Sequence, residues 1–269
     1  MTIQSLNQQI ANLDYYYDSH PTRKDLMSIS VPHFKLVVEL VNSLSYYYPP
    51  QNNFVIGSLN IYQSPDLNEY PIEPDIALFK GLYLPVEEQQ QTRSWKMILP
   101  NRPAPDVVFE LCSKETWHED LDPDKKPLAY SKLGVKEYFA YDPNAPRLWR
   151  SNRLGPRLHG WRYRDGQIQK LVPDETTGWL WSEELDSWLG EDGPHLRLYN
   201  SIGELRLNQV EVALQREATE RIAKEVALQR EATERIAREK AQQREATERI
   251  AREKAWAKLR ELGVDPESL

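Results

Sequence analysis

The sequence has little of several residue types, and each shortage excludes a class of protein. Its 269 residues include a single cysteine, Cys112, so they offer neither an internal disulfide nor a cysteine-rich zinc site. The five histidines are scattered and lack the HxxxH or HxH spacing of a zinc enzyme. No segment approaches about 18 consecutive apolar residues, and the N-terminus lacks the basic start and apolar run of a signal peptide. We therefore expect a cytoplasmic protein without a membrane span.

The chain also lacks an excess of positive charge. Its formal net charge is −7, whereas a protein that coats nucleic acid without sequence preference usually carries a basic balance. The same charge argues less strongly against a nuclease, because acidic metal ligands add negative charge and basic groups can be local. Hydrophobic residues make up 40% of the chain, which is enough for a core.

The order of the predicted elements is typical of an α/β domain with a crossover connection. Apolar residues recur at helical spacing after Pro32, and short apolar runs alternate with turn signals further on. We expect a domain over residues 1–208, with its elements in this order: a helix at 31–44, strands at 54–62, 74–79 and 105–112, a helix at 125–133 capped by Asp124 and ended by Gly134, a strand at 135–141, and β-hairpins over 147–207.

The remaining residues, 209–269, contain an internal repeat with a period of 14 residues. The segment 214–223 recurs at 228–237 and again, with Gln242 in place of leucine, at 242–251. We expect one long charged helix here. Its isoleucines and alanines form a thin apolar seam, so a coiled coil and a lone helix both stay open. A coiled coil would make the protein a homo-oligomer, in the simplest case a dimer.

Two acidic residues lie inside apolar, strand-like runs. In the run 105–112, Glu110 shares one face with Val108 and Cys112, while Phe109 and Leu111 lie opposite. A carboxylate in such a place is costly to bury unless it is paired or binds a cation. With Asp75 on a neighbouring strand, it would offer Mg²⁺ the hard oxygen ligands that this ion prefers.

A catalytic lysine is not at the simplest position, two residues after Glu110, because Cys112 stands there. The candidate is Lys126, in the first turn of the predicted helix at 125–133. A cation is disfavoured at that end of a helix dipole, so a carboxylate or phosphate partner would explain it. The alternative is an ordinary solvent-exposed pair with Asp122 or Asp124.

Several of these segments together resemble a known family. The resemblance rests on Val55-Ile56-Gly57, Pro74-Asp75-Ile76-Ala77, Pro105-Asp106-Val107-Val108-Phe109-Glu110-Leu111-Cys112-Ser113, Lys126-(3)-Tyr130 and Gly134-Val135-Lys136-Glu137-Tyr138-Phe139-Ala140-Tyr141-Asp142-Pro143. They are similar to the Uma-type restriction-endonuclease domain, a PD-(D/E)xK family abundant in cyanobacteria. The resemblance covers roughly residues 20 to 205.

The resemblance implies a restriction-endonuclease-like fold, a mixed sheet flanked by helices, and a Mg²⁺ or Mn²⁺ site. It implies that Asp75 and Glu110 are the metal carboxylates and Lys126 a migrated active-site lysine. It also makes Glu39, on the first helix, a candidate fourth catalytic residue. The chain departs from the family at Ser113-Lys114, where a proline usually follows the serine, and its acidic loop 119–124 is about two residues longer.

A basic and aromatic stretch follows the predicted strand at 135–141. Arginines can follow phosphates and interleaved aromatics can stack on bases, so this stretch is a candidate nucleic-acid surface. The alternative is a hairpin whose long side chains cover apolar surface. The arginines are Arg147, Arg150, Arg153, Arg157, Arg162 and Arg164.

The sequence therefore supports two functional hypotheses. The first is a Mg²⁺-dependent endonuclease that hydrolyses DNA phosphodiester bonds. The second is a non-catalytic scaffold, in which a nuclease-like domain carries a coiled-coil tail. The missing strand lysine and the acidic net charge favour the second.

Overall fold

The computed structural model describes residues 31–66, 70–113, 116–143 and 156–262. Residues 1–30 of the predicted domain and the arginines Arg147, Arg150 and Arg153 lie outside these residues. The chain divides into two compact units, Met1–Gln209 and Val210–Leu269.

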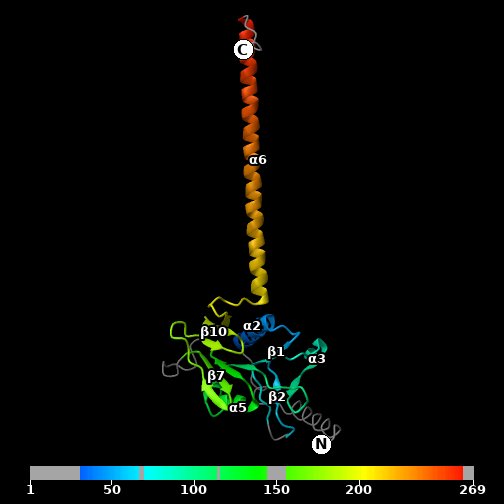
Figure 1. The fold of residues 1–269 in the computed structure, drawn as a ribbon, viewed down its shortest axis with the longest axis vertical. Coiled ribbons are helices and arrows are strands. Elements are labelled where there is room, and N and C mark those ends of the chain that lie inside the picture. The colour runs from blue at the N-terminus through cyan, green and yellow to red at the C-terminus, as the bar shows by residue number, and fades with distance from the viewer. Residues whose placement is uncertain (1–30, 67–69, 114–115, 144–155, 263–269) are drawn as a thin grey trace. The chain divides into compact units, whose positions relative to one another are not determined.

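A six-stranded mixed sheet forms the centre of the first unit (Figure 1). Its strands β5 and β6 are parallel and every other neighbouring pair is antiparallel. In spatial order the strands are β1 (Asn53–Gly57), β3 (Ile76–Lys80), β5 (Val107–Leu111), β6 (Glu137–Tyr141), β7 (Leu158–Arg164) and β8 (Gln167–Lys170). The mixed sheet and the hairpin strands that follow it confirm the predicted fold class.

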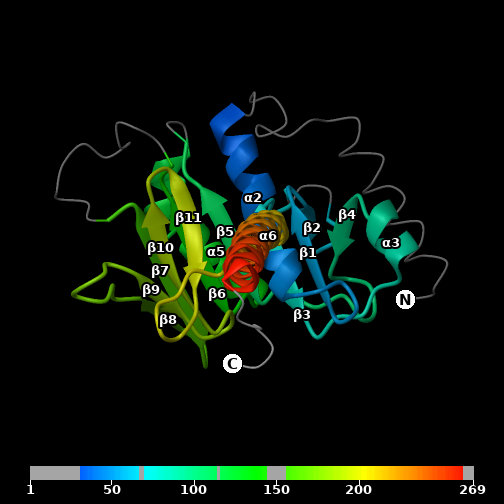
Figure 2. The same ribbon diagram turned by 90° about the horizontal axis from the view of Figure 1, so that it is seen from above.

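Within the described residues of this unit there are also two smaller sheets and four helices. Helix α2 lies between β11 and β1, and it contacts both (Figure 2). The small sheets are β9 (Leu180–Ser182), β10 (Ser187–Asp192) and β11 (His195–Tyr199), and the parallel pair β2 (Asn60–Tyr62) and β4 (Ser94–Lys96). The helices are α2 (Val31–Tyr47), α3 (Val86–Gln91), α4 (Trp117–Leu121) and α5 (Lys126–Leu133).

Two local predictions were wrong. The predicted strand at 54–62 is two strands in different sheets, because Ser58 takes a left-handed conformation with φ of 51° between them. The predicted cap Asp124 does not cap α5: Lys125 is the N-cap residue, and the Asp124 amide donates to the Asp122 carboxylate instead. Gly134 ends α5 in the left-handed conformation, as predicted.

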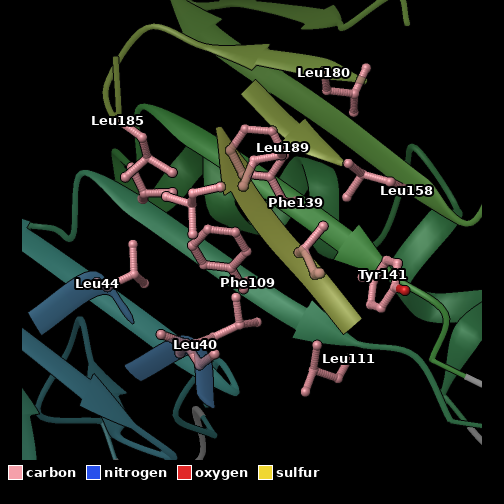
Figure 3. Close-up of a cluster of buried hydrophobic side chains, with 14 of the residues drawn as sticks. Leu40, Leu44, Phe109, Leu111, Phe139, Tyr141, Leu158, Leu180, Leu185 and Leu189 are labelled. Carbon is pink, nitrogen blue, oxygen red and sulfur yellow. The ribbon is translucent and has the colours of Figure 1, made fainter. Parts of the chain in front are cut away.

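The central strand β5 is buried on both faces, and its side chains alternate between two apolar clusters. Phe109 and Leu111 pack with Leu40 and Leu44 of α2 on one side (Figure 3). Val108 and Cys112 pack on the other side, in a cluster that includes Tyr130 of α5. This alternation is the one the sequence predicted, and it sends Glu110 toward the α5 side.

The long helix α6 (Gln209–Glu261) spans 53 residues and contains no buried residue. Most of its large apolar side chains are exposed, with Ile222 at 60%, Ile236 at 49% and Ile250 at 49% exposure. Its intrahelical ion pairs, such as Arg238 with Glu234, are 3.8 to 3.9 Å long. Within the described ranges, no helix has the length and apolar character needed to cross a membrane.

Candidate active site

Strand pairing brings Asp75 and Glu110 together. In the antiparallel pair β3–β5, Ile76 lies opposite Phe109, so the preceding residue, Asp75, reaches the position beside Glu110. The Leu111 amide donates to Asp75 Oδ2 over 2.7 Å. Both acids are 2% exposed. Two carboxylates from adjacent strands therefore share one buried side of the sheet.

Glu110 is held by two groups of α5. The Tyr130 hydroxyl donates to Glu110 Oε1, and Lys126 Nζ lies 3.0 Å from Glu110 Oε2. Burial, with the charge of Glu110, raises the pKa of Tyr130 well above its usual value. Tyr130 is therefore a fixed donor that orients the carboxylate.

Lys126 contacts a second carboxylate. Its Nζ lies 2.6 Å from Asp120 Oδ1, and its side chain is 25% exposed. Burial alone would lower the pKa of Lys126, but the charges of Glu110 and Asp120 together raise it above the ordinary value. Lys126 thus stays a cation, and it cannot serve as a general base near neutral pH. Lys126 does not pair with Asp122 or Asp124, the solvent-exposed partners that the sequence analysis gave as the alternative.

Asp120 was not predicted as a site residue. The sequence places it in an acidic loop, yet it is fully buried in α4. The Thr116 hydroxyl donates to Asp120 Oδ2 over 3.1 Å, and the Tyr138 hydroxyl donates to the Asp120 carbonyl over 2.8 Å. The longer acidic loop therefore supplies a carboxylate that fixes the lysine, a role that charge counting along the sequence does not reveal.

His33 is a second residue that sequence reasoning missed. It lies in the first turn of α2, and its Nε2 is 3.3 Å from Asp75 Oδ1. Its position just after Pro32 marks a helix start but gives no sign of a partner 42 residues later in the chain. The contact places the beginning of α2 at the carboxylate pair.

The donor set fits a hard divalent cation. The carboxyl groups of Asp75, Glu110 and Asp120 are all buried, and Lys126 contacts two of them, those of Glu110 and Asp120. Mg²⁺ is commonly bound by one or two carboxylates, with waters and substrate phosphates as its other ligands. Among the described residues, no group of three or more His, Cys, Asp or Glu side chains is arranged so that it could hold a metal ion. A Mg²⁺ site at Asp75 and Glu110 therefore stays a prediction, in which waters and substrate phosphates would supply the other ligands.

Glu39 does not join this group through its carboxylate. Its Oε2 lies 2.6 Å from His195 Nδ1 and its Oε1 accepts from Arg197 Nη1 over 2.9 Å. Both carboxylate oxygens of Glu39 therefore bond to side chains of β11. The apolar stretch around Glu39 reflects contact with this sheet.

The described arginines of the predicted nucleic-acid surface have internal partners. Arg162 donates to Glu137, Glu183 and the Trp181 carbonyl, and its side chain is 13% exposed. Arg157 lies 3.5 Å from Glu191, and Arg164 contacts Glu183 over 2.6 Å. Arg162 therefore joins β7 to β9 instead of facing a phosphate.

The fold and the family can now be stated. The mixed sheet with flanking helices is a restriction-endonuclease-like α/β fold, as the sequence predicted. Residues 26–169 match the Uma2 family, described as "Putative restriction endonuclease", a shorter range than the predicted 20 to 205. The match covers more than half of the chain, so the chain belongs to this family.

One solved structure is similar to part of the chain. It is described as "a putative nuclease belonging to DUF820" from Anabaena variabilis, and it is 19% identical with a TM-score of 0.40. The alignment covers 59% of this chain and 76% of that one. No curated protein matches the chain significantly. Family membership supports a nuclease function.

Proposed function

We propose that the protein is a Mg²⁺-dependent endonuclease that hydrolyses DNA phosphodiester bonds, acting in the cytoplasm. The observation that carries this proposal is the convergence of Asp75, Glu110 and Lys126 on the α5 side of the sheet. Mn²⁺ offers a substitute for Mg²⁺ at the same oxygen ligands.

The residues of the chain take distinct roles in this proposal. Asp75 and Glu110 hold the ion, and Tyr130 and the Leu111 amide orient their carboxylates. An ion held by these two carboxylates would supply a Lewis acid for a phosphoryl oxygen and would lower the pKa of a bound water molecule. Lys126, kept protonated by Glu110 and Asp120, offsets the negative charge that grows on the phosphate in the transition state.

The test is nicking of supercoiled plasmid by the full chain with Mg²⁺ or Mn²⁺. We expect Glu110→Gln and Asp75→Asn to lose activity by about 100-fold or more, the scale seen when a group stabilising transition-state charge is removed. Glu87→Gln, an exposed carboxylate of α3, is the matched control and should act like the unaltered protein. Equal nicking by Glu110→Gln and Glu87→Gln, or none by the unaltered protein with either metal, would refute the proposal.

The second candidate function is a scaffold, and the exposed apolar row of α6 favours it. Ile222, Ile236 and Ile250 recur every 14 residues and stay exposed in the single chain. A second copy of α6 would cover them, which makes a homodimer the simplest assembly.

Self-association is measured by light scattering after size-exclusion chromatography. We expect a dimer for the unaltered chain and a monomer for Ile222→Glu/Ile236→Glu. Glu220→Gln/Glu234→Gln, on the charged face of the same helix, is the control and should stay dimeric. A monomeric unaltered chain, or a dimer that survives both isoleucine changes, would contradict the assembly. A dimer without metal-dependent nicking would favour the scaffold.

A further inference from the structure

A polar cavity of about 370 Å³ lies in the first unit, against the two-stranded sheet β2–β4. Asn60 and Tyr62 of β2, and Ser94 and Lys96 of β4, contribute to its wall. Its other lining residues come from the end of α3 and the segments that follow it. The mechanism proposed above uses none of these residues.

The lining of the cavity carries more positive than negative charge. Three cationic side chains line it: Arg93, Lys96 and Arg102. Among the described lining residues the one carboxylate is Glu88, and it forms an ion pair with Arg102. In a chain with a net charge of −7, a concave surface with this balance is a local exception. It suits an anion, because cationic donors around a concave site recognise phosphate groups well.

Arg102 forms a fixed part of this wall. Its guanidinium stacks on the Trp95 ring at 4.4 Å, and its side chain is 19% exposed. Trp95 is itself fully buried, and its indole donates to the Pro103 carbonyl over 2.8 Å. The core therefore holds the Arg102 guanidinium in place. Less side-chain entropy is then lost when an anion binds to it.

Asn60 adds a hydrogen-bonding group that has no partner within the described residues. Its Oδ1 is buried and accepts no hydrogen bond there. A buried amide without a partner is unfavourable, so a molecule in the cavity would gain by bonding to it. A nucleotide unit of DNA carries both a phosphate for the cations and base N–H groups that can donate to the amide oxygen.

The cavity and the carboxylate pair share a stretch of backbone. The Ser58 amide donates to the Asp75 carbonyl over 3.0 Å, and β2 begins two residues later. Ile61 of β2 then pairs with Ile72, which precedes Asp75 by three residues. Ile61 and Trp95 also belong to the same apolar cluster as Val108 and Tyr130, on the side of the sheet that Glu110 faces.

We propose that this cavity is a second phosphate-binding site, which holds the backbone of the nucleic-acid substrate beside the phosphodiester bond that reacts. The inference rests on the proposed nuclease function and adds to it the surface that positions the polymer. It also adds Arg93, Lys96 and Arg102 to the candidate nucleic-acid surface that the sequence placed between Arg147 and Arg164.

The test uses Arg93→Gln/Lys96→Gln in the full chain and leaves Arg102 in place, because Arg102 packs on Trp95. Binding to a fluorescent DNA duplex is measured by anisotropy in EDTA, so that no cleavage occurs, over a series of salt concentrations. We expect about tenfold weaker binding, and a salt dependence reduced by about one to two phosphate contacts. Arg216→Gln/Lys224→Gln, two exposed cations of α6, removes the same charge and should bind like the unaltered chain.

Equal binding by the two double variants would overturn the inference, since total charge alone would then explain the affinity. A second arm measures thermal stabilisation by inorganic phosphate and by a mononucleotide. If these protect the unaltered chain but not Arg93→Gln/Lys96→Gln, while duplex binding is the same for both, the cavity holds a small phosphorylated molecule and the backbone assignment is wrong.

The failure of this inference can be told apart from that of the nuclease proposal. Glu110→Gln should lose nicking and keep duplex binding, whereas Arg93→Gln/Lys96→Gln should lose binding and recover its nicking rate at saturating DNA. If the unaltered chain binds DNA through the cavity but never nicks it, the nuclease proposal fails alone. If it nicks and the cavity variant binds normally, the cavity inference fails alone.

Discussion

The charged residues of the two units differ in their burial and in the lengths of their ion pairs. In the first unit Glu110, Asp120 and Glu137 are at most 2% exposed, and each has a cationic partner at 3.0 Å or closer. In α6 no residue is buried, and the ion pairs are 3.8 to 3.9 Å long between exposed side chains. The same types of charged residue therefore contribute very different free energies to the stability of the two units.

This difference shows where a charged residue is informative. A buried carboxylate must be paired, since an isolated charge in the core is very costly. An exposed ion pair is worth about 0 to 1 kcal/mol, and such pairs can change partners with little consequence. Glu110 within an apolar strand thus indicates a site, whereas the charges of the 14-residue repeat indicate a solvated helix.

The largest effect that we expect is a loss of folding stability when Glu137 is replaced. This residue of β6 accepts from Arg162, the Ser182 hydroxyl and the Glu183 amide, and so joins the central sheet to the β9–β11 sheet. We expect Glu137→Ala to lower the free energy of unfolding by about 3–5 kcal/mol, because it removes the buried carboxylate that Arg162 pairs with and leaves the Ser182 hydroxyl and the Glu183 amide without their acceptor. Urea denaturation followed by tryptophan fluorescence measures this loss.

The matched control lies in α6. Glu234→Ala removes a carboxylate that is 71% exposed and lies 3.8 Å from Arg238. Its effect on the same unfolding transition should stay within about 0.5 kcal/mol. A loss below about 1 kcal/mol for Glu137→Ala, or a similar loss for the two variants, would break the contrast between the units.

Much of the fold could be predicted because periodicity reports burial directly. The alternation in 105–112 predicted the two faces of β5, and Gly134 predicted the end of α5. The break at Ser58 was missed, since a serine in a left-handed conformation has no sequence signal like that of glycine. The Asp124 cap was wrong because Asp122 offers the nearby amide a competing partner.

Which candidate residues lie close together was predictable only where a charge interrupts an apolar run. Asp75 and Glu110 met that condition, and the structure places them together with Lys126. Asp120 did not, because it lies among other acidic residues and is buried only through tertiary packing. The partners of Glu39 and Arg162 could not be predicted. They are Arg197 and Glu137, which come from distant strands that no local pattern identifies.

A smaller effect on stability is expected at His159. The first unit buries this histidine, whereas α6 contains no histidine. His159 lies in β7 and is 7% exposed. Burial, with the nearby charge of Lys170, lowers its pKa to about 4. Between about pH 6.5, where an unfolded histidine titrates, and about pH 4, the unfolded chain binds a proton that the folded chain does not.

Stability should therefore fall as the pH drops through this window, by at most roughly 3 kcal/mol from this residue. His159→Gln should flatten the slope of unfolding free energy between about pH 6.5 and pH 4, measured by urea denaturation at several pH values. His118→Gln, which removes an exposed histidine, should keep the slope of the unaltered chain. If the slope is the same in all three proteins, His159 is protonated in the folded state as readily as in the unfolded one. The core around β7 would then tolerate a charged imidazole, and the contrast with α6 would be weaker than the burial of Glu110 and Glu137 implies.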